Sequence, residues 1–137
     1  MPAIYRRLLS SLAALALGGV SVCWGAKQAA HASLDTARDA ASANMSTEEG
    51  VKFQAESTTA LHSGGTAAMD QCLRKLATKP HRATVYVRLG TDAAVREVLT
   101  DPRSNASKCL ERQARAARFP RPPRDDYWVG IRVILQP

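Results

Sequence analysis

The large apolar side chains of this chain fall into two blocks, with an interval between them that is nearly empty of such residues. One block spans residues 4–24 and the other spans residues 69–135 of the 137-residue chain. Alanine inflates the apolar fraction of 45%, and aromatic residues make up only 5%. A hydrophobic core must therefore come from the C-terminal half, which is small enough to have marginal stability.

The first apolar block predicts a secretory signal peptide over residues 1–25. Arg6 and Arg7 precede an uncharged Leu/Ala-rich run of about fifteen residues, which is shorter than the roughly 20 residues of a bilayer-spanning helix. Small residues suited to cleavage lie between positions 25 and 32, and the sequence does not select one. We expect an exported protein, periplasmic or in the outer envelope. Two alternatives stay open: an uncleaved inner-membrane anchor through residues 8–24, and lipidation at Cys23.

The interval between the blocks predicts a flexible tether over residues 26–65. It is rich in Ala, Ser and Thr, and its few larger apolar residues are too dispersed to form a core. Alanine-rich residues 33–44 favour a transient helix, and Ser63-Gly64-Gly65 is typical of a flexible joint. The folded domain is then expected over residues 66–137.

The C-terminal half carries five segments with clear hydrophobic periods. Apolar residues three and four positions apart indicate helices, and alternating apolar residues indicate strands. The order is helix, strand, strand, helix, strand, which predicts an α+β fold with two helices packed on a three-stranded antiparallel sheet. The expected segments are residues 67–77, 83–89, 95–99, about 104–118, with Ser104 or Asn105 as the helix cap, and 129–135.

The cysteine count of three requires an explanation in an exported protein. Removal of the leader takes Cys23 away and leaves Cys72 and Cys109, both on the apolar faces of predicted helices. An oxidising compartment favours a disulfide between them, and closing that loop stabilises the fold by roughly 3–4 kcal/mol. Two buried free thiols are the alternative. No Cys-x-x-Cys pair or His/Cys cluster indicates a metal site.

An ordered set of residues in the C-terminal half agrees with one known family pattern. These residues are Cys72, Leu76, Pro80, Val85, Val87, Leu89, Val95, Cys109-Leu110, Phe119-Pro120-Arg121-Pro122, Ile131 and Val133. The set resembles the AgmX/PglI-type C-terminal domain, which is itself similar to the TonB C-terminal domain, over about residues 67–135. Three places depart from the family pattern: Leu73 replaces a common aromatic, Ala93 replaces a turn glycine, and Ile134-Leu135 replaces Pro-Phe.

The sequence favours a binding module over an enzyme. His31, His62 and His81 are scattered, no nucleophile or phosphate-binding motif occurs, and we expect no catalytic residue, metal or cofactor. The resemblance implies that an extended segment of an envelope protein pairs with an exposed sheet edge. A homodimer through the same edge is a further option. The candidate edge is the last strand, with Val129, Ile131, Val133 and Leu135.

A basic stripe supports a different class of partner. Residues 66–137 hold fourteen Lys and Arg residues against seven Asp and Glu residues. Four of the basic residues recur at helical spacing: Lys108, Arg112, Arg115 and Arg118. Such a stripe suits an anionic envelope polymer or membrane surface, while export argues against nucleic acid. A membrane-anchored TonB-like energy transducer is the third alternative.

Overall fold

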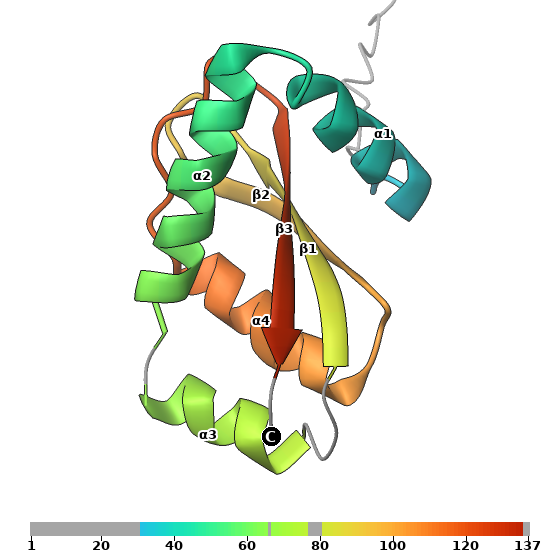
Figure 1. Ribbon diagram of the computed structural model, residues 1–137, viewed down its shortest axis with the longest axis vertical. Coiled ribbons are helices and arrows are strands. Elements are labelled where there is room, and N and C mark those ends of the chain that lie inside the picture. The colour runs from blue at the N-terminus through green and yellow to red at the C-terminus, as the bar shows by residue number, and fades with distance from the viewer. Residues whose placement is uncertain (1–30, 66, 77–80, 136–137) are drawn as a thin grey trace, which may run out of the picture.

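The computed structural model describes residues 31–65, 67–76 and 81–135 (Figure 1). Over these residues the chain forms four helices and a three-stranded sheet, which confirms the α+β class. In chain order the elements are α1 (Leu34–Asn44), α2 (Glu48–Ser63), α3 (Ala67–Leu76), β1 (His81–Leu89), β2 (Val95–Asp101), α4 (Asn105–Ala116) and β3 (Tyr127–Leu135).

The sheet is antiparallel with the strand order β2-β1-β3. Val85 of β1 lies opposite Thr100 of β2 and Ile131 of β3. Because side chains alternate along a strand, Val85 and its neighbours at two-residue steps face one side, which we call the core face. Val85, Val87 and Ile131 are fully buried there.

Helix α4 covers the core face of the sheet. It starts at the N-cap Ser104, in a capping box with Ser107, and it buries Ala106, Cys109, Leu110 and Ala114. Cys109 forms a disulfide with Cys72 of α3, with the two Cα atoms 6.1 Å apart. The predicted pair of cysteines thus joins the two helices of the C-terminal half.

The predicted flexible tether is wrong, because residues 34–63 form two capped helices that pack on the sheet. Ser33 caps α1 and Thr47 caps α2 through their side-chain oxygens. Helix α2 buries Phe53 and Leu61 in the main core. The folded unit therefore begins near residue 33 rather than at residue 66. Helices α1, α2 and α4 contact the sheet, and α3 packs mainly on α4.

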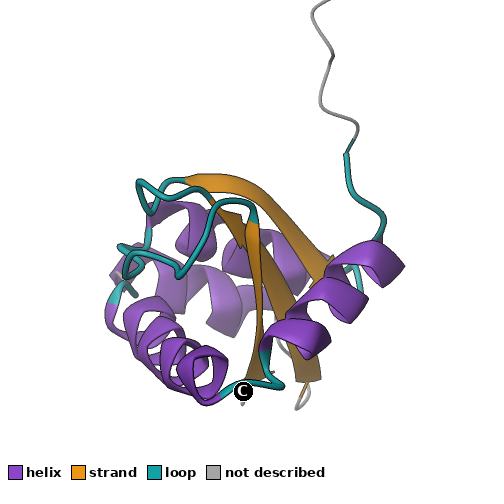
Figure 2. Ribbon diagram, turned by 90° about the horizontal axis from the view of Figure 1, so that it is seen from above, coloured by secondary structure: helices purple, strands orange, loops and turns teal. Residues whose placement is uncertain are grey.

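Helix α1 lies on the opposite side of the sheet from α4, and α2 lies beside the β3 edge (Figures 1 and 2). Its buried Ala37 and Ala41 pack against Tyr86 and Trp128 in a second, smaller core. Alanine has a short side chain, so α1 lies close to these aromatic rings, and its partly buried Leu34 packs against the same cluster. We call this side of the sheet the second face.

The predicted N-terminal leader precedes the described part of the chain. The signal peptide, its cleavage region before residue 31 and Cys23 lie outside the described residues. Within the described part, no helix is long and apolar enough to cross a membrane.

Helix α4 ends at Ala116, and the extended backbone of Ala117 turns Arg118 away from the predicted helical stripe.

Candidate functional site

Strand β3 pairs with β1 on one side and forms an edge of the sheet on the other. In an antiparallel pair, the backbone groups of alternate residues face the neighbouring strand or point away from it. The carbonyl of Trp128 accepts a 2.8 Å hydrogen bond from Asn44 Nδ2, and the carbonyl of Gly130 accepts one from Gln54 Nε2. Both donors come from the helices that flank this edge, so the backbone of even-numbered β3 residues points outward.

The outward-pointing residues beyond Gly130 are Arg132 and Ile134. No hydrogen bond from the described residues reaches their backbone N–H and C=O groups on that side, and we call these groups the open edge. The side chains of the predicted edge residues Val129, Ile131 and Val133 are instead buried in the core. Their backbone groups face β1, and the side chain of Leu135 lies outside the described part.

Three hollows meet at the open edge. A groove of about 780 Å³ lies between α1 and α2 on the second face, and we call it the α1–α2 groove. A second hollow, of about 440 Å³, shares Thr84 and Arg132 with it. The third, of about 210 Å³, shares Val133 and Ile134 with the second. Its apolar lining includes Leu61, Leu73 and Leu110.

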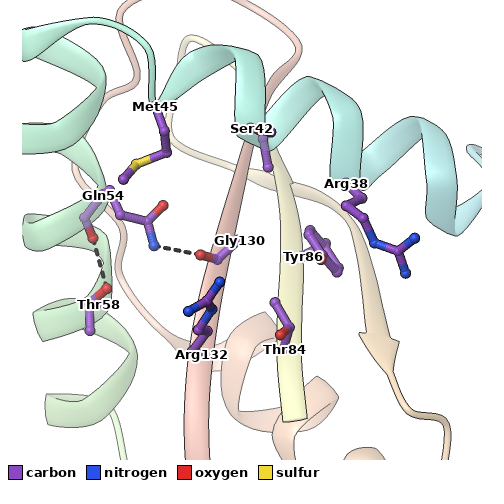
Figure 3. Close-up of a pocket in the computed structure, with 10 residues that line it drawn as sticks. Arg38, Ser42, Met45, Gln54, Thr58, Thr84, Tyr86, Gly130 and Arg132 are labelled. Carbon is purple, nitrogen blue, oxygen red and sulfur yellow. Dashed lines mark hydrogen bonds between the residues drawn. The ribbon is translucent and has the colours of Figure 1, made fainter.

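Gly130 lies in the lining of the α1–α2 groove (Figure 3). A Cβ atom at this position would lie 3.0 Å from Cε1 of Tyr86 and 3.5 Å from Cβ of Ala41. Glycine therefore lets α1 and Tyr86 approach the strand closely. Ser42 of α1 and Gln54 of α2 lie on opposite walls.

Two guanidinium groups line the groove, and only one of them forms ion pairs with carboxylates of the described residues. Arg38 forms ion pairs with Asp35 at 3.1 Å and with Asp101 at 2.9 Å. Hydrogen bonding to the Tyr86 side chain, and then to Asp101, raises the pKa of Arg38. Arg132 is exposed and has no ion pair with any carboxylate of the described residues. Its charge is therefore available to a ligand.

No family model, curated protein or solved structure matches this chain. The resemblance to the AgmX/PglI-type and TonB C-terminal domains accordingly remains a prediction, and the site is interpreted from its own geometry.

The predicted basic stripe is shorter than expected. Lys108, Arg112 and Arg115 are exposed on α4, whereas Arg118 follows the end of the helix. Nη2 of Arg112 lies 3.0 Å from Sγ of Cys72 and 3.9 Å from Sγ of Cys109. Arg112, one of the three basic residues on α4, therefore lies beside the disulfide.

Two described histidines and the buried Glu97 make local contacts within the fold. His62 Nδ1 bonds the carbonyl of Thr58 within its own helix, and His31 lies 3.5 Å from Glu97. Glu97 is buried and pairs with Arg88 at 3.0 Å, and Arg88 also lies over the Trp128 ring. This cluster links β1, β2 and β3 under α1. No group of three or more metal-binding side chains occurs within the described ranges.

Proposed function

We propose that this protein is an exported, non-enzymatic interaction module that binds an extended peptide segment by strand addition at the open edge of β3. The observation that supports this function is the meeting of hollows on both sheet faces at Arg132, Val133 and Ile134. The Cys72–Cys109 disulfide is consistent with an oxidising compartment.

The open edge supplies the backbone part of the interaction. Arg132 and Ile134 together offer two N–H donors and two C=O acceptors to an added strand. Each net hydrogen bond contributes roughly 0.5–1.5 kcal/mol, so backbone pairing over this short length gives weak binding. Side-chain contacts must supply most of the affinity and all of the specificity.

The two smaller hollows are placed to receive those side chains. Successive side chains of an added strand point to opposite faces of the sheet. One set would enter the hollow of about 440 Å³ beside Arg82 and Arg132. The other set would enter the hollow of about 210 Å³, whose walls include Leu61 and Leu73. The edge thus offers a subsite beside the two arginines on one face and a subsite of mixed apolar and polar lining on the other.

The other edge of the sheet is less suited to pairing. In β2 the register shifts so that Leu89 lies opposite Val95 and Arg88 lies opposite Glu97, which leaves Arg96 as a bulged residue. Pro102 follows directly after the strand. A bulge, a charged side chain and a proline are the features that protect edge strands from additional pairing. This contrast favours β3 as the binding edge.

Substitution of Ile134 by proline tests the function. Ile134→Pro removes one outward N–H donor at a position where proline is tolerated, because that donor has no partner in the sheet. Ile134→Thr is the matched control, since it keeps the donor and changes only the exposed side chain. Ile131 is unsuitable, because its backbone faces β1 and proline there would break the sheet.

The assay is fluorescence anisotropy with a fluorescein-labelled peptide of alternating Thr and Val, whose residues favour strands. We expect Ile134→Pro to weaken binding about two- to tenfold relative to Ile134→Thr, the loss of one hydrogen bond, with the melting temperatures of the two variants equal. Equal affinities would refute strand addition at this edge. Binding that vanishes at high salt and on Lys108→Gln/Arg115→Gln would assign the interaction to the basic face of α4 instead.

A further inference from the structure

We infer that the bound segment continues beyond the open edge into the α1–α2 groove, where an acidic group of the segment pairs with Arg132. This inference rests on the proposed function and adds a second, sequence-selective part to the same site. The groove would then act as the specificity pocket for an acidic extended peptide.

Backbone pairing cannot extend along the whole of β3. The carbonyls of Gly130 and Trp128 are already bonded to Gln54 and Asn44. These two amide side chains stand where the donors of an added strand would lie. A segment that pairs with Ile134 and Arg132 must therefore leave the plane of the sheet before Gly130.

The second face provides a continuous path at this point. The hollow beside Arg82 and the α1–α2 groove share Thr84 and Arg132, so a segment leaving the edge enters the groove directly. The groove volume of about 780 Å³ lies within the range of roughly 300–1,000 Å³ that is usual for ligand sites.

The charges of the groove select an anionic segment. Arg38 is neutralised by Asp35 and Asp101, whereas Arg132 stands at the junction of edge and groove without an acidic partner in the described part of the chain. Arg82, which lines the neighbouring hollow, is also exposed. A guanidinium group binds a carboxylate through paired hydrogen bonds, so an Asp or Glu side chain, or a terminal carboxylate, fits this position.

Three fluorescein-labelled probes test the inference on the full chain by fluorescence anisotropy. All contain the same alternating Thr-Val segment. The first probe ends there, the second adds a Gly-Ser tail with aspartates, and the third adds the same tail with lysines. Each tail is placed at either end in separate probes, because the direction of the added strand is open. In one orientation, we expect the acidic tail to bind at least about tenfold more tightly than the lysine tail.

Variants of the groove separate its contribution from that of the edge. Arg132→Gln should abolish the preference for the acidic tail over the lysine tail, and both tailed probes should then bind this variant with the affinity that the short probe has for the same variant. Ser42→Glu places a carboxylate on the groove wall and should reduce the acid-tailed probe to the affinity of the short probe. Ala43→Glu is the matched control: it adds the same charge to an exposed neighbour of α1 that does not line the groove.

The outcomes distinguish the two proposals. Equal binding of acidic and lysine tails, with the short probe still sensitive to Ile134→Pro, would overturn the groove inference and leave strand addition intact. The groove inference would also be overturned if free polyglutamate displaced the labelled acid-tailed probe as effectively as the unlabelled form of that probe does, since charge alone would then explain binding. Failure of the short probe to bind would overturn strand addition, and the groove inference with it.

Discussion

Removal of the Cys72–Cys109 disulfide should lower the free energy of unfolding by about 4 kcal/mol. The two cysteines are 37 positions apart, and the loop-closure entropy of a chain of that length corresponds to about 4 kcal/mol at 25 °C. Cys109 is fully buried, so replacing it by alanine adds a smaller loss of sulfur packing. Domains of this size are stable by roughly 5–15 kcal/mol in total. The disulfide would thus supply a large share of the stability.

The assay is urea unfolding of the oxidised protein, the reduced protein and the Cys72→Ala/Cys109→Ala variant. The fluorescence of Trp128, which is 5% exposed, reports the transition. Comparison of the reduced protein with the variant separates the crosslink from the packing of sulfur, and we expect these two to agree within about 1 kcal/mol. The slope of unfolding against urea should rise without the crosslink, because the unfolded chain becomes less compact.

The result that would refute this reasoning is a loss below about 1 kcal/mol on reduction with no change of slope. It would mean that the crosslink does not restrict the unfolded chain, and that contacts between α3 and α4 other than the disulfide hold these helices together.

Three further predictions concern single residues, each checked by urea unfolding. Phe53 is 4% exposed with its ring centroid 5.0 Å from that of Tyr127, so Phe53→Ala should cost about 3–5 kcal/mol. Val51, which is 50% exposed, should tolerate alanine within about 0.5 kcal/mol; equal effects at the two positions would favour a flexible tether. Ala93 has a left-handed backbone with φ 63°, so Ala93→Gly should stabilise by up to about 1 kcal/mol, and a loss would contradict this. Burial raises the pKa of Tyr127 above 10.0, so the unfolded chain releases this proton first and stability should fall as pH rises above about 10. Tyr127→Phe should remove that part of the decline, and an unchanged decline would contradict the assignment.

The fold of the C-terminal half could be predicted because its hydrophobic periodicity is strong and can be recognised within each short segment. Alternating residues such as Val85, Val87 and Leu89 indicate a strand whatever the rest of the chain does. The order of elements and the disulfide pair followed from such patterns. The backbone of Ala93 is left-handed, at a position where the resemblance, which stays a prediction, expects glycine.

The N-terminal helices could not be predicted because their buried faces carry almost no local signal. Helix α1 packs through Ala37 and Ala41, with Leu34 partly buried against the same cluster, and short alanine side chains give a weak amphipathic pattern. Helix α2 buries Phe53 and Leu61 eight positions apart, and the residue midway between them, Ser57, is buried but polar. Tertiary contact with the sheet, rather than the amphipathic pattern, stabilises these two helices.

The candidate site depends on the same long-range contacts. Alternation along β3 shows which side chains share a face, but not whether the backbone of Val129 or of Gly130 points away from the sheet. Pairing with β1 decides which β3 residues have backbone groups that point away from the sheet. Asn44 and Gln54, which are more than seventy residues away in sequence, set the length of the open edge. These amides occupy the upper half of the edge, and the helices that carry them form the walls of the groove. The segments predicted to be a passive tether therefore determine where a partner strand can pair and where it must turn.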